Sequence, residues 1–171
     1  GAYIAFVQKD LKYMIGFSSV SHMGLVVLGV STLNHNGLVG AGVQMFSHGI
    51  MTALFFAVTG MVYDRAHTRM IPELGGMMKV MPFAGIGFII GGLVSMGMPG
   101  FSGFVAEFPI FMGVWQSRWL VAVIASISIV ITAAYIMMNI RKVFFGEMPE
   151  KLVGHVGDVT VLDKVAIVTL C

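Results

Sequence analysis

The fold is decided by the stretch FAGIGFIIGGLVSMGMPGFSGFVAEFPIFMGVW, residues 83–115, which is apolar on both sides of an interrupting Met-Pro-Gly triplet. A helix needs about 20 mostly apolar residues to cross the hydrocarbon core of a bilayer. Neither residues 83–98 nor residues 102–115 reach that length alone. Proline and glycine interrupt helices. We therefore expect one discontinuous transmembrane helix broken near Met98–Gly100, or a re-entrant pair of shorter helices.

The composition places the chain in a membrane. Of its 171 residues, 57% are hydrophobic and 11% are charged, with a mean hydropathy of +0.92. Soluble domains carry roughly 25% charged residues, so lipid must be part of the solvent of this chain. The net charge of +2 is too mild to predict nucleic-acid binding. The only cysteine is Cys171, so neither a disulfide framework nor a cysteine metal site is expected.

Other apolar runs predict further membrane spans. Residues 1–33 are long enough for a helix, a break and a second helix, and LNHNG at residues 33–37 predicts a turn. Residues 40–63 and 119–140 predict two complete spans, and another begins near Val159. The sequence therefore predicts an all-α, polytopic transmembrane helix bundle.

Two charged residues fall within the apolar runs. Glu107 follows the break by about two helical turns. A charge inside lipid costs about 2.5–3.5 kcal/mol and usually marks function, and broken helices persist where they line a polar cavity. We interpret Glu107 as functional, with a fixed ion pair to a lysine as the alternative. Lys12 is either a group inside the membrane or, with Lys9 and Asp10, a mark of its boundary.

Polar side chains also recur on predicted helix faces. One face, at four-residue spacing, carries Gln44, His48 and Thr52. A second carries Ser128, Thr132, Tyr135 and Asn139. A histidine can pass protons, or the polar groups can simply join helices by hydrogen bonds. A third face, of small residues, carries Gly87, Gly91 and Ser95 and predicts close helix packing.

Four motifs in order carry a specific resemblance. They are KDLKYMIGFSSVSHMGLVVLG (9–29), QMFSHGIMTALFF (44–56), YDRAHTR (63–69) and MPGFSGFVAEF (98–108). The series resembles the C-terminal half of the antiporter-like membrane subunits of respiratory complex I. The absence of a lysine soon after His48, together with the glutamate at 107, is similar to the M-type subunit of NADH:quinone oxidoreductase, the counterpart of mitochondrial subunit 4.

The resemblance implies a proton-translocating function and a role for each matching residue. Lys12 would be the central proton-carrying lysine, Glu107 the acid at the distal end of the path, and His48 part of its hydrophilic axis. His67 matches a histidine near the membrane surface, which we interpret as structural. Supporting positions would be Gln44, Thr52, Ser128, Thr132 and Tyr135.

The resemblance also implies an assembly. Residues 1–171 would be part of a single antiporter-like transmembrane domain, lacking its N-terminal half and cut within a C-terminal span. We expect no cofactor in this chain, with NADH, FMN, iron–sulfur clusters and quinone in partner subunits. The partners would be other membrane subunits, especially the L-type and N-type, in a bacterial inner membrane. The alternatives are a subunit of a multisubunit cation/proton antiporter or membrane-bound hydrogenase, and a purely structural scaffold.

Overall fold

The computed structural model describes residues 1–153 and 156–171, and every regular element in this part of the chain is helical. The α-helices are α1 (Ala2–Val7), α2 (Leu11–Ser31), α3 (His35–Ala66), α4 (Pro82–Ser95), α5 (Ser102–Asn139) and α6 (Val161–Leu170). The short turns are η1 (Ile71–Glu73), η2 (Met77–Lys79), the π-helical η3 (Ile140–Phe144) and η4 (Glu150–Leu152). The predicted all-α bundle is confirmed.

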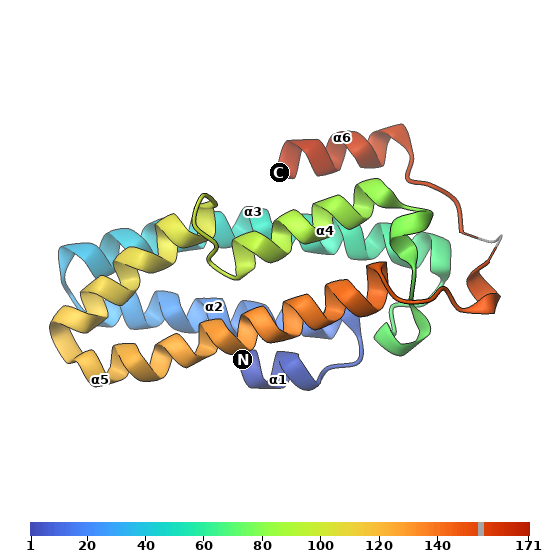
Figure 1. The fold of residues 1–171 in the computed structure, drawn as a ribbon. Coiled ribbons are helices and arrows are strands. Elements are labelled where there is room, and N and C mark those ends of the chain that lie inside the picture. Colours follow the sequence, from blue (N-terminus) through green and yellow to red (C-terminus); the bar gives the residue numbers. More distant parts are fainter. Residues whose placement is uncertain (154–155) are drawn as a thin grey trace.

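The predicted break separates α4 from α5. In Figure 1, α4 and the first part of α5 follow one another in the same general direction, with a looped connection between them. This connection needs positive φ angles at Gly97 (63°) and Gly100 (100°), a conformation that glycine adopts at little cost. The two segments form one discontinuous helix, as predicted, and not a re-entrant pair.

The predicted span at residues 119–140 is the second part of α5. Arg118 has non-helical backbone angles (φ −153°, ψ 88°) inside α5. The chain reverses there, and the second part of α5 runs back beneath α4 (Figure 1). Its apolar side chains remain uncovered, with Val130 70% and Ile124 67% exposed. Such a surface is stable in contact with lipid.

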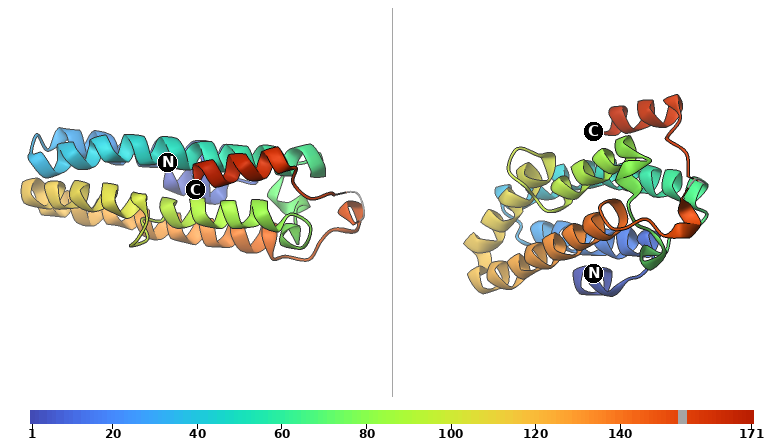
Figure 2. Two further views of the ribbon diagram at one scale, coloured as in Figure 1. Left: turned by 90° about the horizontal axis from the view of Figure 1, so that it is seen from above. Right: turned by 45° about the vertical axis from the view of Figure 1, so that its right-hand side comes forward.

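Within residues 1–153 and 156–171, three helical stretches are long and apolar enough to cross a membrane: Leu11–Ser31, His35–Ala66 and Ser102–Phe144. Figure 2 shows α2 and α3 as one layer beside the layer formed by α4 and α5. Between the layers, Phe88 is buried, with its ring centroid 4.9 Å from that of Phe55 and 5.1 Å from that of Phe144. These apolar contacts fix α4 against α3. The polar side chains near the break then lie close to one another.

A hydrogen-bonded corner joins the start of α2 to the segment that follows α3. The Asp10 side chain accepts hydrogen bonds from the backbone N–H of Lys12 (2.8 Å) and Tyr13 (3.4 Å), which caps α2. Its Oδ2 also accepts a hydrogen bond from Arg69 Nε at 2.6 Å, and this bond raises the pKa of Arg69. The predicted break within residues 1–33 lies at residues 8–10, between the end of α1 and the start of α2.

Replacing Asp10 with alanine should destabilise this corner. The variant removes a helix cap, which is worth about 1 kcal/mol, and leaves Arg69 without its carboxylate. The measurement is thermal inactivation of the assembled full-length protein. Asp10→Asn is the matched control, because it keeps a capping oxygen and loses only the charge. Equal losses in the two variants would show that the ion pair, and not the cap, stabilises the corner.

Candidate functional site: a buried histidine–glutamate pair at the broken helix

Glu107 is buried beside a histidine. It lies in the first part of α5, and only 5% of its surface is exposed. Its Oε1 is 3.2 Å from His22 Nδ1, and Gln44 Nε2 donates to the same oxygen at 3.5 Å. A buried carboxylate is stable when it is paired and hydrogen-bonded. The partner of Glu107 is therefore the imidazole of His22, and not a lysine.

His22 connects the carboxylate to the other half of the broken helix. Its Nε2 is 3.1 Å from Ser95 Oγ, at the last residue of α4. Gln44 Nε2 lies 3.3 Å from His22 Nδ1. Side chains from α2, α3, α4 and α5 thus meet at one imidazole. Because Nδ1 faces an acid and Nε2 a hydroxyl, the ring can accept a proton on one side and release one on the other.

The turn at the break touches the carboxylate directly. A Cβ atom at Gly97 would lie 2.7 Å from Glu107 Oε2. This glycine therefore leaves room for the second carboxylate oxygen on the side of the break, while Oε1 faces His22. The two oxygens of Glu107 therefore have different surroundings.

His48 extends the site along α3. Its ring centroid is 5.2 Å from that of His22, and Thr52 Oγ1 lies 3.2 Å from His48 Nε2. Its Nδ1 and the Oε1 of Gln44 are buried and have no hydrogen-bond partner among the described residues. Unpaired buried polar atoms cost about 1–3 kcal/mol each, so positions of this kind favour water. The predicted face of Gln44, His48 and Thr52 therefore points at the His22–Glu107 pair.

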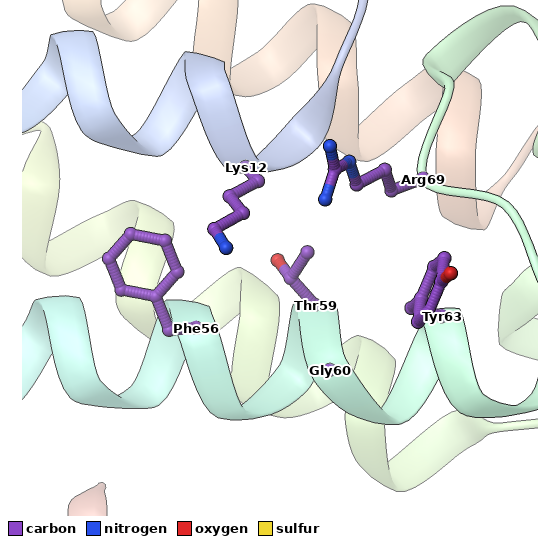
Figure 3. A pocket seen from close by; sticks show the side chains of 6 residues that line it. All are labelled: Lys12, Phe56, Thr59, Gly60, Tyr63 and Arg69. Carbon is purple, nitrogen blue, oxygen red and sulfur yellow. The ribbon is translucent and has the colours of Figure 1, made fainter.

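Lys12 lies apart from this pair. It is exposed in the first turn of α2, ten residues before His22, which corresponds to about 15 Å along a helix. Lys12 lines a cavity of about 580 Å³ together with Phe56, Thr59, Gly60, Tyr63 and Arg69. In Figure 3 its side chain points between Phe56 and Thr59. The structure does not bring Lys12 into contact with Glu107.

The remaining predicted positions divide into two groups. His67 is exposed at the left-handed C-terminal cap of α3 (φ 51°), and Ser128 Oγ donates to the carbonyl of Ala125 in its own helix. Neither contacts the pair. Thr132 and Tyr135 are buried, and the Tyr135 hydroxyl donates to Ser18 Oγ at 2.7 Å. The second polar face is thus directed inward only in part.

Sequence reasoning missed two residues of the site, His22 and Ser95. Ser95 was assigned to small-residue packing, yet its hydroxyl bonds the imidazole. The available signal for His22 was its spacing of four residues from Ser18, which places both on one face of α2. Within residues 1–153 and 156–171, no three His, Cys, Asp or Glu side chains gather in a way that could hold a metal ion.

Comparison with known proteins identifies the family of the chain. Residues 1–132 match the model of the transmembrane family described as NADH:quinone oxidoreductase/Mrp antiporter. The chain belongs to this family. Membership in the NADH:quinone oxidoreductase/Mrp antiporter family confirms the resemblance that the four motifs carry.

Individual members of the family are similar over nearly the whole chain. Subunit M of F(420)H(2) dehydrogenase from Methanosarcina mazei is 39% identical over 159 residues, covering 93% of this chain and 32% of that protein. NADH-quinone oxidoreductase subunit M from Rhodobacter capsulatus is 37% identical over 161 residues, covering 94% and 31%. Respiratory complex I from Thermus thermophilus with bound NADH contains a chain with 28% identity and a TM-score of 0.90, covering 98% and 36%. The chain thus spans about a third of the length of these relatives.

Proposed function

We propose that this chain is part of the proton-translocating membrane subunit of an NADH:quinone oxidoreductase, with His22 and Glu107 as its proton-exchanging pair. The observation that carries the proposal is the buried contact of 3.2 Å between these side chains, beside a helix break. A charged or proton-sharing pair in the membrane interior is costly to maintain and marks a functional path. The family and the M-type relatives support the same activity.

The pair can hold one proton in two places. With the proton on His22 Nδ1, the imidazolium and the Glu107 carboxylate attract each other across 3.2 Å. With the proton on Glu107 Oε1, both groups are neutral. In a dry interior the charged form loses solvation and gains attraction, so hydration and nearby charges decide between the two forms. A proton on Glu107 can then leave toward the break, where Oε2 faces Gly97.

Polar groups continue from this pair along α3. The His48 ring lies beside that of His22 at an angle of 40°, and Thr52 bonds His48. Thr59 lines the same cavity as Lys12, and its buried hydroxyl has no hydrogen-bond partner among the described residues. We assign to His48 the transfer of protons between His22 and water held along this face. Lys12 would then attract and release protons at the surface end. Gln44 and Thr52 orient the two imidazoles.

Redox energy would arrive from other subunits. Moving a charge against 100 mV costs about 2.3 kcal/mol, and the proposed partners are the L-type and N-type membrane subunits, with NADH, FMN, iron–sulfur clusters and quinone held elsewhere in the complex. The membrane would be a bacterial inner membrane. Because a relative is named as subunit M of F(420)H(2) dehydrogenase, the electron donor is expected to depend on the partner subunits, and not on this chain.

A second candidate is a subunit of a multisubunit cation/proton antiporter, since the family model also covers Mrp antiporters. In that case proton movement would depend on a cation gradient and not on quinone reduction. The missing lysine after His48 and the glutamate at 107 favour the oxidoreductase. Proton pumping that starts with quinone reduction in the absence of a sodium gradient would distinguish the two.

Glu107→Gln in the full-length subunit within its complex tests the proposal. Loss of a positioned proton-transfer group typically lowers a rate by about 10²–10⁴-fold, so coupled quinone reduction and proton pumping should collapse while assembly is retained. Glu150→Gln, at an exposed position, is the matched control. Normal pumping in an assembled Glu107→Gln complex would overturn the proposal.

Lys12→Ala separates the two interpretations of Lys12. If Lys12 only marks the membrane boundary, pumping should stay within a few-fold of the parent protein. The measurement is proton pumping per quinone reduced in the assembled complex. A collapse as deep as that of Glu107→Gln would instead identify Lys12 as the central carrier that the family resemblance implies.

A further inference from the structure

Ser95 is the last residue of α4, beside the helix break, and the proposed function does not use it. The side chains of Ser95 and His22 are both buried, and Ser95 Oγ lies 3.1 Å from His22 Nε2. Glu107 contacts the other ring nitrogen of His22 from α5. The two halves of the broken helix therefore hold the same imidazole from opposite sides.

The Ser95 hydroxyl is directed toward another helix. A serine within a helix commonly donates its hydroxyl hydrogen to a carbonyl oxygen of the preceding turn. The serines of this chain that do so include Ser31, Ser117, Ser126 and Ser128. Among the described residues Ser95 makes no bond of this kind, and its hydroxyl contacts the His22 imidazole of α2 instead. The hydroxyl is therefore available to the site.

The state of the Glu107 carboxyl group determines what Nε2 of His22 needs from this hydroxyl. When the pair holds its transferable proton, as imidazolium and carboxylate or as neutral imidazole and carboxylic acid, Nε2 carries a hydrogen and Ser95 Oγ must accept. When the pair has released that proton, the ionised carboxylate keeps the remaining ring hydrogen on Nδ1. Nε2 then has only a lone pair, and Ser95 must donate. A hydroxyl group does both by rotating about its C–O bond.

We propose that Ser95 is a positioning residue whose hydroxyl bonds His22 Nε2 in both the proton-loaded and the proton-released state of the pair. This inference rests on the proposed function of the His22–Glu107 pair. Without the hydroxyl, a buried ring nitrogen would lack a partner in either state. The loss would be larger in the loaded state, because hydrogen bonds from a charged donor are stronger than those between neutral groups. Ser95 thereby favours loading of the pair and orients the imidazole toward Glu107.

The competing interpretation is that Ser95 serves only as a small residue in the packing of α4. Small residues do allow close contacts in this helix, since a Cβ atom at Gly91 would lie 3.3 Å from the Phe55 ring and one at Gly92 would lie 2.8 Å from Ile136 Cγ2. Two substitutions have opposite expected results under the two interpretations. Ser95→Ala keeps the side chain small and removes the hydroxyl, whereas Ser95→Thr keeps the hydroxyl and adds a methyl group.

The experiment compares these two variants in the full-length subunit within its complex. Ser47→Ala is the matched control, because Ser47 is also buried but donates to Ser102 Oγ at 2.8 Å and not to the pair. Each assembled variant is measured for coupled quinone reduction and proton pumping. We expect coupled turnover to fall about tenfold in Ser95→Ala, since one buried hydrogen bond at the pair is lost. Ser95→Thr and Ser47→Ala should stay near the parental rate.

The protonation of His22 provides a readout that a purely structural bond would not change. In a complex labelled with ¹⁵N-histidine, NMR distinguishes a ring nitrogen that carries a hydrogen from one that has a lone pair. The signals of His22 are those that disappear in a His22→Gln variant. We expect a smaller fraction of His22 with a hydrogen on Nε2 in Ser95→Ala than in Ser95→Thr or the parent protein.

Parental turnover in an assembled Ser95→Ala complex would overturn the inference, and so would slower turnover with unchanged His22 signals. If Ser95→Thr does not assemble, Ser95→Ala and the His22 signals decide alone. The Glu107→Gln variant, measured in parallel, keeps this inference distinct from the proposed function. If Glu107→Gln collapses while Ser95→Ala pumps normally, only the role of Ser95 is wrong. If Glu107→Gln also pumps normally, the proposed function itself fails.

Discussion

A His22→Leu variant is expected to lose proton pumping and to assemble poorly. Removing one partner from a buried ion pair costs about 3–5 kcal/mol, because the other charge stays buried without compensation. In this variant the unpaired group would be the Glu107 carboxylate, which would keep only its long hydrogen bond of 3.5 Å from Gln44 Nε2. The carboxyl group would escape this cost only by holding a proton permanently, and it could then no longer exchange one. The measurements are the yield of assembled complex and its pumping.

The double variant His22→Leu/Glu107→Leu separates stability from function. Replacing both members of a buried pair with apolar groups is often neutral or stabilising, so assembly should recover while pumping stays absent. His35→Leu is the control for an added leucine, because His35 is exposed at the start of α3. If His22→Leu alone pumps normally, the pair is structural. If the double variant assembles no better than the single one, the cost lies in packing and not in the unpaired carboxylate.

Much of the fold can be predicted from the sequence because lipid restricts the backbone structures that are possible. Every backbone polar group inside the bilayer must be bonded within the chain, so long apolar runs become helices. The Pro99–Gly100 break and the turn before His35 needed only local backbone chemistry. The reversal at Arg118 lies between two of the predicted apolar runs, residues 102–115 and 119–140. Local sequence patterns do not predict that the second part of α5 packs alongside α2.

The site was predictable only where its residues share one helix. Gln44, His48 and Thr52 form a stripe that periodicity detects. The structure buries Gln44 and His48, with Thr52 half-buried beside His48. His22, Ser95 and Glu107 lie on three different helices and meet only through packing, which leaves no spacing signal in one sequence. The alternative interpretation gave Glu107 a lysine partner, but the structure places the His22 imidazole there. Histidine suits this buried position because its side chain can be neutral near pH 7, and burying a neutral imidazole costs less free energy than burying a charge.

A close contact at Gly40 holds α3 against α5. Helices cross closely in membranes where small residues face one another. At Gly40 of α3, a Cβ atom would lie 2.7 Å from the backbone nitrogen of Ile110 and 2.9 Å from the carbonyl oxygen of Ala106 in α5. Backbone atoms cannot move aside as a flexible side chain can, so the two helices would have to separate. Glu107 follows Ala106 directly and would move with it.

Gly40→Ala should therefore disturb the His22–Glu107 pair indirectly, by forcing α3 and α5 apart. Overpacking costs about 1–3 kcal/mol, so we expect a lower temperature of thermal inactivation and reduced proton pumping in the assembled complex. Gly42→Ala, two residues along the same helix, is the matched control, since nothing lies within 4 Å of a Cβ atom there. That variant should be neutral or slightly more stable, because alanine favours helices over glycine by up to about 1 kcal/mol. Equal behaviour of the two variants would mean that the crossing of α3 and α5 does not position Glu107 against His22.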